Sequence, residues 1–252
     1  ADDKVILKFH LWARYFFPKY FTSKDAPFHN KVDLARLAAY RGQLKQFVDV
    51  GFRGCAKTSR MKLFIAFCIT NDESRVKRYF RCLSAEIDNA KQSVTDIYNM
   101  LVSTRVVALY PEVFQKTDTK REETMSSFTT ATGIKLIAKP IGVDQRGNIM
   151  EEARADFDWY DDIETKTTIR SAKKTKMIGE NMEEARTGLA KDGSSVYTCN
   201  YFSELWNVHA LITKTSPDKL VIITPIIENG EITWPSRFSQ TDIDYMKQTD
   251  ED

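Results

Sequence analysis

Histidine, paired cysteines and long apolar stretches are scarce in this sequence, and each shortage excludes a class of protein. The 252 residues contain three widely separated histidines and four cysteines, with no C-x-x-C pair. A zinc site is therefore not expected, and Cys55, Cys68, Cys82 and Cys199 should be reduced and mostly buried. No apolar run approaches the roughly 18 residues of a membrane span, and the first residues lack a signal-peptide pattern. We therefore expect a protein that works inside a cell, away from membranes.

A large excess of charge is also missing. Lysine and arginine number 37 against 35 acidic residues, a net charge of +2, so any contact with DNA must use a local patch. One basic run extends from residue 166 to 176. It could contact nucleic-acid phosphates, insert an arginine into a neighbouring subunit's site, or form a solvated helix face, and the sequence leaves these open. Its basic members are Lys166, Arg170, Lys173, Lys174 and Lys176.

The stretch GFRGCAKTS, residues 51–59, is the most informative in the chain. It separates a short apolar run at 47–50 from a helical pattern at 61–69, and strand, glycine loop and helix are the context of a phosphate-binding P-loop. The pattern G-x-x-x-x-G-K-[ST] fits except that Ala56 replaces the last glycine. Loop amides would hold phosphates, Lys57 would bridge the outer phosphates, and the Thr58 hydroxyl would ligate Mg²⁺. The predicted nucleotide-binding residues are Gly51, Phe52, Arg53, Gly54, Cys55, Ala56, Lys57, Thr58 and Ser59.

A second motif places acidic residues at the end of a strand. Residues 155–160 lean apolar, although Asp158 interrupts them, and Asp161, Asp162 and Glu164 follow. We assign Asp161 to the Mg²⁺ ion through water. A neighbouring carboxylate would polarise the attacking water, with Asp162 as the first candidate and Glu164 as the second.

A further strand, 195–200, ends in Thr198 and Asn200. These short polar residues would lie at the carboxyl edge of the sheet, where open α/β folds bind ligands.

Strands alternate with helices along the chain, which predicts a three-layer αβα fold with a mainly parallel central sheet. Strand-like runs at 127–130 and 133–141 suggest an antiparallel excursion beside that sheet, and 219–224 predicts a buried strand. Asn229-Gly230 predicts a type I′ hairpin turn. We expect a helical segment at 1–45 that packs on the core, an ATPase domain at 46–240, and an acidic tail or linker at 241–252. Candidates for adenine contact are Phe28, His29, Arg41 and Gln43.

In this order the motifs resemble the ATPase domain of the large terminase subunit, the DNA-packaging motor of tailed bacteriophages. The resemblance covers residues 28–238 and includes further matches beyond the P-loop and the acids. These are Arg53 within the loop, Arg146-Gly147, Arg154-Ala-Asp, Thr198-Cys-Asn200 and Trp234–Phe238. It implies an ASCE or RecA-like P-loop NTPase that uses ATP and Mg²⁺.

The resemblance also implies roles for single residues. Arg53 would contact the γ-phosphate from within the loop, and Arg146 would act on its own site or on a neighbour's. Thr198 and Asn200 would couple hydrolysis to domain movement. Two departures from the family pattern are Ala56, which could slow nucleotide exchange, and an Asp-Asp pair in place of Asp-Glu.

The implied function is a viral ATPase that drives double-stranded DNA into a procapsid in the host cytoplasm. Its partners would be DNA, the portal protein and the small terminase subunit, with a ring-forming homo-oligomer on the procapsid and a monomer in solution left open. Nothing in the chain fits the family's nuclease domain, so no DNA cleavage is expected. The alternatives are a helicase-type or other P-loop NTPase, and a nucleotide-gated binding module in which Ala56 has disabled turnover.

Overall fold

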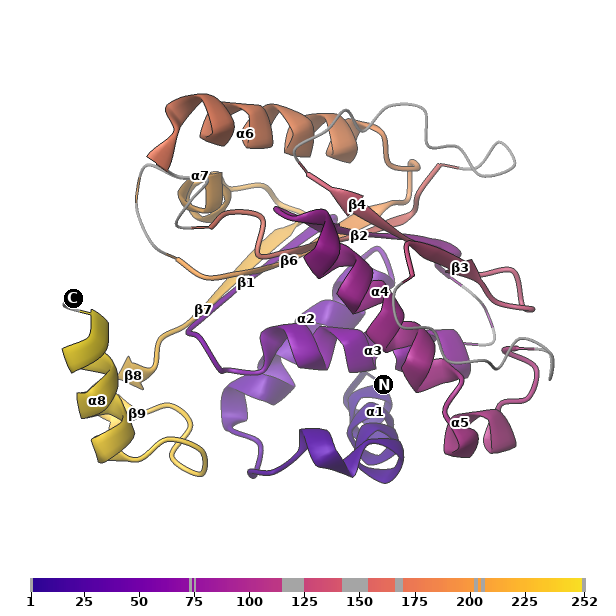
Figure 1. The fold of residues 1–252 in the computed structure, drawn as a ribbon, viewed down its shortest axis with the longest axis horizontal. Helices are drawn as coiled ribbons and strands as arrows, with labels where there is room; N and C mark the ends of the chain where they lie inside the picture. Colours follow the sequence, from indigo (N-terminus) through magenta and orange to yellow (C-terminus); the bar gives the residue numbers. More distant parts are fainter. Residues whose placement is uncertain are drawn as a thin grey trace.

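The structure is a computed structural model that describes residues 2–72, 74, 76–114, 125–141, 154–165, 170–201, 204 and 207–250. Within these residues, a seven-stranded sheet in the order β3-β4-β2-β5-β6-β1-β7 lies between two helical layers (Figure 1). Its strands are β1 (Gln46–Gly51), β2 (Tyr79–Ser84), β3 (Ser127–Thr129), β4 (Lys135–Pro140), β5 (Phe157–Asp161), β6 (Ser194–Cys199) and β7 (Lys219–Thr224). All are mutually parallel except β3. The predicted three-layer fold is confirmed.

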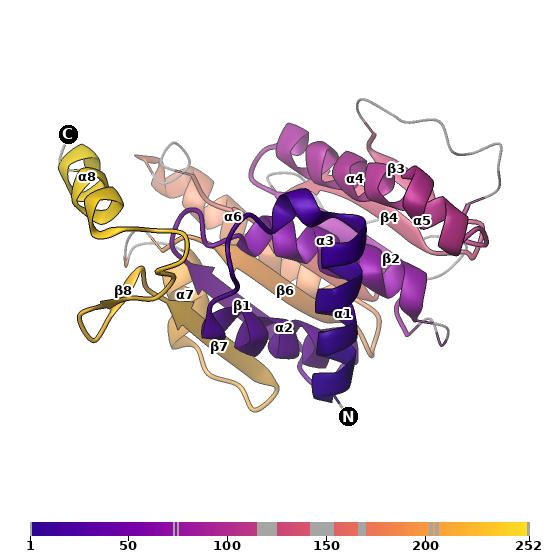
Figure 2. The ribbon, with the colours of Figure 1, turned by 90° about the horizontal axis from the view of Figure 1, so that it is seen from below.

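Helices cover both faces of this sheet (Figures 1 and 2). One face carries α1 (Asp2–Phe16), the short 3-10 helix η1 (Pro18–Tyr20), α2 (Pro27–Tyr40), α3 (Lys57–Asn71), α4 (Ile87–Leu101) and α5 (Thr104–Leu109). The other face carries α6 (Ala172–Thr187) and α7 (Asn207–Thr213). Each layer buries its own apolar cluster against the sheet, as amphipathic elements must. Among the described residues, no helix is both long and apolar enough to span a bilayer.

The strand order places the carboxyl ends of three strands together. β6 lies between β1, which precedes the P-loop, and β5, which ends in the acidic pair. Because parallel strands end at the same edge, the loops after β1, β5 and β6 must meet there.

Two strand predictions need correction. The runs at 127–130 and 133–141 pair antiparallel with each other, as expected, but β4 also pairs in parallel with β2 and so belongs to the main sheet, which leaves only the three-residue β3 antiparallel. β7 was expected to be buried, but it lies at the sheet edge with Leu220 37% and Ile223 54% exposed. An unbroken apolar run fits a buried strand and an edge strand equally well when the neighbours are unknown.

The C-terminal part packs at one end of the sheet. The predicted hairpin turn is confirmed, because Asn229 and Gly230 both have positive φ, as type I′ requires. Its strands, β8 (Ile227–Glu228) and β9 (Glu231–Ile232), form a separate two-stranded sheet. The acidic tail or linker expected at 241–252 instead contains most of helix α8 (Gln240–Asp250), which buries Ile243 beside Trp234 and Phe238. A single buried apolar residue, here Ile243, gives no periodic signal, so the sequence pattern does not indicate this helix.

The aspartate that interrupts the apolar pattern of β5 has a buried partner. Asp158 accepts hydrogen bonds from Nε and Nη2 of Arg81 on β2, at 2.6 and 2.7 Å, and one from the hydroxyl of Tyr160. Arg81 also donates to the carbonyl oxygen of Ala185 on α6. The pair therefore joins two central strands to the helix above them.

Removing one member of this pair should strongly destabilise the fold. Asp158→Ala leaves the Arg81 charge buried and unpaired, so we expect the free energy of unfolding to fall by about 3–5 kcal/mol. Urea denaturation measures the change. The matched control is Glu183→Ala, which breaks the exposed Glu183–Arg186 pair and should cost less than about 1 kcal/mol. Equal losses in the two variants would contradict a structural role for the buried pair.

Candidate functional site

The loop between β1 and α3 adopts the conformation of a phosphate-binding loop. Gly54 has φ +87° and Ala56 has φ +67°, both in the left-handed region. A side chain at Gly51 would bring its Cβ within 2.5 Å of the Cys55 sulfur, so the first glycine is required by space. Ala56 takes the backbone shape that the motif assigns to glycine, at a cost of about 1–2 kcal/mol.

Two side chains of α2 donate hydrogen bonds to carbonyl groups at the end of this loop and at the first residue of α3. His29 donates from Nε2 to the carbonyl oxygen of Cys55 at 3.3 Å, because its Nδ1 already accepts the amide of Ala26 at 2.9 Å. Arg36, seven residues along the helix, donates to the carbonyl oxygen of Lys57 at 3.2 Å. The amides of Phe52 and Cys55 donate to the carbonyl oxygens of Thr224 and Phe52, both at 3.3 Å, so an anion would be bound by the other amides of the loop and of the start of α3.

A buried charge network anchors these two contacts. Arg36 also donates to Asp33 at 2.8 Å and to Asp49 on β1 at 2.7 Å. Arg60, on α3, bonds to Asp33 and, at 2.9 Å, to Asp25. The network thus ties α2, the P-loop strand and the P-loop helix together, with each buried charge paired.

The side chains predicted to act on nucleotide meet in one hydrogen-bonded cluster. Lys57 Nζ donates to Asn200 Oδ1 at 2.8 Å, and Asn200 Nδ2 donates to Asp162 Oδ1 at 3.1 Å. The hydroxyls of Thr58 and Thr198 both donate to Asp161 Oδ1, at 2.8 and 2.6 Å. Side chains from three separate loops are therefore brought to one point at the carboxyl edge of the sheet.

The two acids occupy an unusual environment. Burial, and next the charge of Asp162, raise the pKa of Asp161 to about 6. Burial also raises the pKa of Asp162, although the charges of Lys57 and Arg53 oppose that shift. Arg53 itself is exposed in the loop. Asp162 has φ +44°, one of three non-glycine residues with positive φ in the described part of the chain. Of the three, Asp162 lies in this cluster and Ala56 directly precedes Lys57, and backbone strain of this kind gathers at functional sites.

Glu164 is engaged elsewhere. Its carboxylate accepts hydrogen bonds from the Asn207 side-chain amide at 2.7 Å and from the backbone amides of Asn207 and Val208 at 3.1 and 3.2 Å. It therefore caps the amino end of α7 and is 5% exposed. A carboxylate held by three donors is poorly placed to accept a proton from water.

The four residues considered for contact with adenine lie at opposite ends of helix α2. Phe28 packs near Phe52 of the loop, with ring centroids 6.3 Å apart, and His29 holds the loop as described. Arg41 and Gln43 lie beyond the other end of α2, at the start of β1, so the length of that strand separates them from the loop. The prediction is wrong for those two residues.

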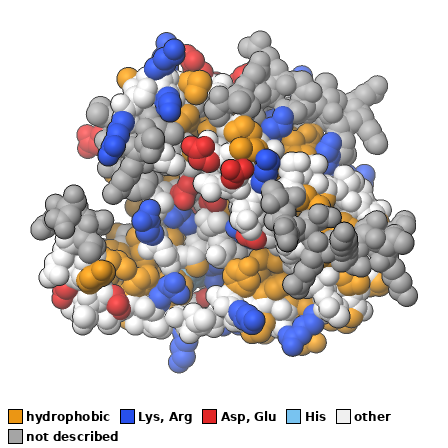
Figure 3. All heavy atoms as spheres, in the orientation of Figure 1, with side chains coloured by type: hydrophobic (Ala, Val, Ile, Leu, Met, Phe, Trp, Pro, Cys, Tyr) orange, Lys and Arg blue, Asp and Glu red, His pale blue; other side chains and the backbone are white. Residues whose placement is uncertain are grey.

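Other predicted residues are exposed or undescribed. Arg146 and Gly147 lie outside the described residues, as does Lys166. Arg170, Lys173, Lys174 and Lys176 are exposed in and before the first turns of α6. The face in Figure 3 mixes acidic and basic side chains, and its described residues show no continuous basic area.

Several functional residues escaped sequence reasoning. Arg36 and Asp33 lie in α2, away from the motifs, whereas Asp49 and Arg60 flank the P-loop pattern in β1 and α3, and Asn207 begins a short helix. The available signal was the spacing of His29, Asp33 and Arg36, which recur on one helix face among apolar residues. Charged residues on the packed face of a helix indicate buried partners.

The C-terminal segment also contacts the loop. A Cβ on Gly54 would lie 3.2 Å from the ring of Phe238, whose centroid is 5.6 Å from that of Phe52. Trp234 lies 4.5 Å from the His29 ring and donates to the carbonyl oxygen of Lys24. The part of the chain after β9 therefore packs against one side of the loop.

The fold and the convergent cluster define the class, which is the P-loop NTPase fold of the ASCE type. No protein-family model matches the sequence, and no curated protein matches it. Among solved structures, the ATPase domain of the large terminase of Thermus phage P74-26, as a mutant, is similar in fold. It has a TM-score of 0.51 and 14% identity, over 84% of this chain and 86% of that one. This finding supports the resemblance to a terminase ATPase domain at the level of the fold.

A second solved structure also matches. It is a complex of Saccharomyces cerevisiae Dbp5 with Nup159, Gle1, IP6 and ADP, with a TM-score of 0.48 and 14% identity. The match covers 88% of this chain and 52% of the Dbp5 chain, so the chain spans about half the length of that relative.

The carbonyl contact of His29 gives a pH prediction. Burial, and next the charge of Arg60, lower the pKa of His29 to about 4 from an ordinary 6.5. A lowered histidine pKa means that the unfolded chain binds the proton first, so stability falls as pH decreases from 6.5 to 4. Asp161, with its raised pKa, acts in the opposite sense over the same range, so the expected effect is a difference between two proteins. Relative to His29→Asn, wild type should lose on the order of 2–3 kcal/mol over this range, measured by denaturation at each pH. The control is His209→Asn on α7, which should follow wild type; a His29→Asn curve that also follows wild type would contradict the assignment.

Proposed function

We propose that this protein binds ATP with Mg²⁺ at the loop between β1 and α3 and hydrolyses it. The observation that carries the proposal is the cluster in which Lys57, Thr58, Asp161, Asp162 and Asn200 converge from three loops. The positive φ of Asp162, and of Ala56 just before Lys57, further favours a functional role over a structural one. The phosphates would lie over the amides at the start of α3, whose dipole favours an anion.

The residues present fit a magnesium ion. The Thr58 hydroxyl and the Asp161 carboxylate, 2.8 Å apart, are oxygen donors of the kind Mg²⁺ prefers, and Mg²⁺ completes its shell with water and phosphate oxygens. When bound, the ion would neutralise charge on the transferred phosphoryl group. Proton loss from Asp161, whose pKa is raised to about 6, would accompany its binding.

The geometry favours Asp162 over Glu164 as the base. Asp162 follows β5 directly, and its carboxylate is bound to Asn200, which also accepts from Lys57. A carboxylate with a raised pKa can accept a proton from the attacking water more readily. Arg53 and Lys57 would offset the negative charge that develops on the phosphoryl oxygens. Glu164 would serve to hold α7.

We further propose that the chain is the ATPase portion of a viral large terminase that moves double-stranded DNA into a procapsid. The ordered motifs and the fold shared with a phage terminase ATPase domain support this reading. Thr198 and Asn200, which contact both acids, would pass the loss of the γ-phosphate to β6. The portal protein, the small terminase subunit and a ring of identical subunits are the proposed partners, in the host cytoplasm.

The catalytic assignment predicts a contrast between two acids. Asp162→Asn, which tolerates the same left-handed backbone, should keep affinity for a non-hydrolysable ATP analogue and lose at least about 100-fold in turnover. Glu164→Gln should lose less than about tenfold in turnover and instead lower the melting temperature, because it weakens the α7 cap. Steady-state ATPase assays and thermal unfolding separate the two effects.

Lys57→Ala is the reference variant for these assays. It should lose most analogue binding, because no other lysine is placed to reach the outer phosphates in the described part of the cluster. Wild-type turnover no greater than that of Lys57→Ala would favour a nucleotide-gated binding module. Loss of turnover in Glu164→Gln with retention in Asp162→Asn would overturn the assignment of the base.

The proposed substrate polymer has its own test. ATP turnover should rise when duplex DNA is added and should rise less with single-stranded DNA or RNA, because a packaging motor tracks an intact duplex. The comparison uses the same molar concentration of phosphate for each polymer and a fixed salt concentration. Stimulation by single strands alone would favour the helicase-type alternative.

A further inference from the structure

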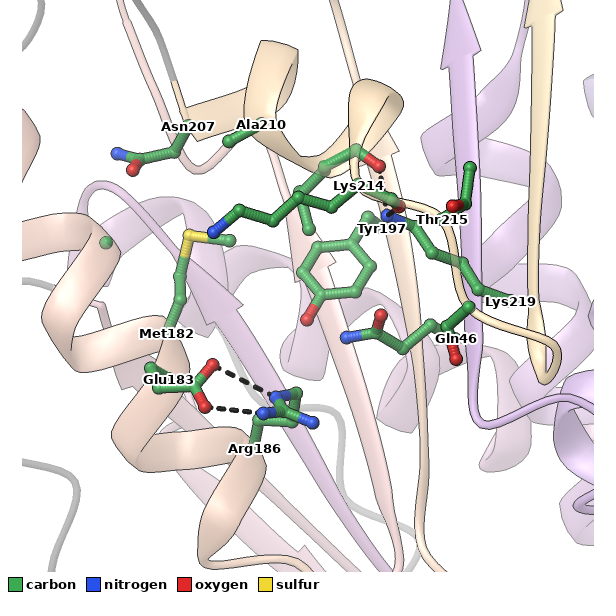
Figure 4. A pocket seen from close by; sticks show the side chains of 13 residues that line it. Gln46, Met182, Glu183, Arg186, Tyr197, Asn207, Ala210, Lys214, Thr215 and Lys219 are labelled. Atoms are coloured by element: carbon green, nitrogen blue, oxygen red, sulfur yellow. Dashed lines mark hydrogen bonds and ion pairs between the residues drawn. The ribbon is translucent and has the colours of Figure 1, made fainter.

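A cavity of about 410 Å³ opens on the sheet face opposite the P-loop helix, between α6 and α7 (Figure 4). Its floor is formed by Tyr197 of β6 and Gln46 at the start of β1. Met182 of α6 and Ala210 of α7 form apolar walls. A volume of about 300–1,000 Å³ with apolar walls and a few polar groups is typical of small-ligand sites.

Positive charge predominates around this cavity. It is lined by Arg186, Lys214 and Lys219 against a single carboxylate, Glu183, which pairs with Arg186 at 2.5 Å. Lys219 donates to the carbonyl oxygens of Leu211 and Lys214, at the carboxyl end of α7. Two lining cations are therefore already bound to protein groups.

Lys214 is the cation without such a partner. Figure 4 shows its side chain extended across the cavity toward Met182, and its ammonium group makes no hydrogen bond or ion pair with the residues that the structure describes. Burial, and next the charge of Lys214, lower the pKa of Lys219. The two lysines therefore repel each other across a hollow, and an anion between them would relieve that repulsion.

Two lining residues contact residues that lie close in sequence to Asp161 and Asp162. The Asn207 side chain donates to Glu164, two residues after Asp162. The Tyr197 ring stacks on Tyr160 at 4.4 Å, and Tyr160 directly precedes Asp161. A ligand here would contact side chains that touch Glu164 and Tyr160 without touching the P-loop.

We propose that the cavity between α6 and α7 is a second anion site, which binds a phosphate group through Lys214 with its apolar part against Tyr197 and Met182. The ammonium and guanidinium groups present are the donors that phosphate oxygens prefer. The phosphate could belong to a free nucleotide or to a nucleic-acid backbone. The site does not depend on ATP hydrolysis and stands or falls separately from it.

Calorimetry with pyrophosphate, without Mg²⁺, tests the site in the Lys57→Ala background, which removes the competing P-loop. We expect binding that Lys214→Gln weakens by about tenfold, the worth of one charged hydrogen bond. The matched control is Lys176→Gln, an exposed lysine on α6 that does not line the cavity, and it should change the affinity less than twofold. Ala210→Phe, which fills the cavity without changing charge, should also abolish binding.

The outcomes separate the source of the phosphate. AMP and a short DNA duplex are titrated into the same variants. If Lys214→Gln weakens the binding of AMP alone, the phosphate belongs to a free nucleotide. If it weakens the binding of the duplex alone, the phosphate belongs to a nucleic-acid backbone. No pyrophosphate binding in the Lys57→Ala protein, or equal effects of Lys214→Gln and Lys176→Gln, would overturn the proposal. Thermal unfolding of each variant shows whether it is folded, and Lys214→Gln, on an exposed residue, should match its parent.

Discussion

The candidate nucleotide site depends on the direction in which the carbonyl groups of one short loop point. A loop that binds phosphate through its amides must turn some carbonyls away, and buried carbonyls need donors there. His29 and Arg36 supply those donors to Cys55 and Lys57 from a single helix face. Helix α2 is therefore part of the site's construction, because without His29 the carbonyl of Cys55 would lose its side-chain donor.

That arrangement buries the charges of Arg36 and Arg60, and the network pairs each of them with carboxylates. Arg36 and Arg60 are 1% and 4% exposed, yet Asp33 lies between them and Asp49 and Asp25 complete their pairing. Such networks add little stability compared with apolar packing, but removal of a single member is costly. The network therefore fixes the position of the loop more than it stabilises the fold.

The fold and the convergent cluster could be predicted from sequence because their signals are local. A strand, a glycine-containing loop and a helix occur in sequence around Lys57, and the order of motifs places the ends of β5 and β6 at the same edge. The pairing of β4, the exposure of β7 and helix α8 could not be predicted, since each depends on which surfaces meet. Asp158 illustrates the difference: its sequence context shows only an interruption, and its partner Arg81 lies 77 residues away.

The substitution at position 56 can be weighed in physical terms. Alanine in the left-handed region costs about 1–2 kcal/mol relative to glycine, but the Ala56 methyl packs in the cluster that contains Trp234 and Phe238. Burial of one methyl group returns about 0.8 kcal/mol, which offsets much of that cost. Because the loop keeps the required conformation, alanine alone gives no reason to expect a site that binds nucleotide without turnover. Its methyl group instead packs the loop against the C-terminal segment. A change in the loop conformation on nucleotide binding would therefore alter the contacts of the loop with Trp234 and Phe238.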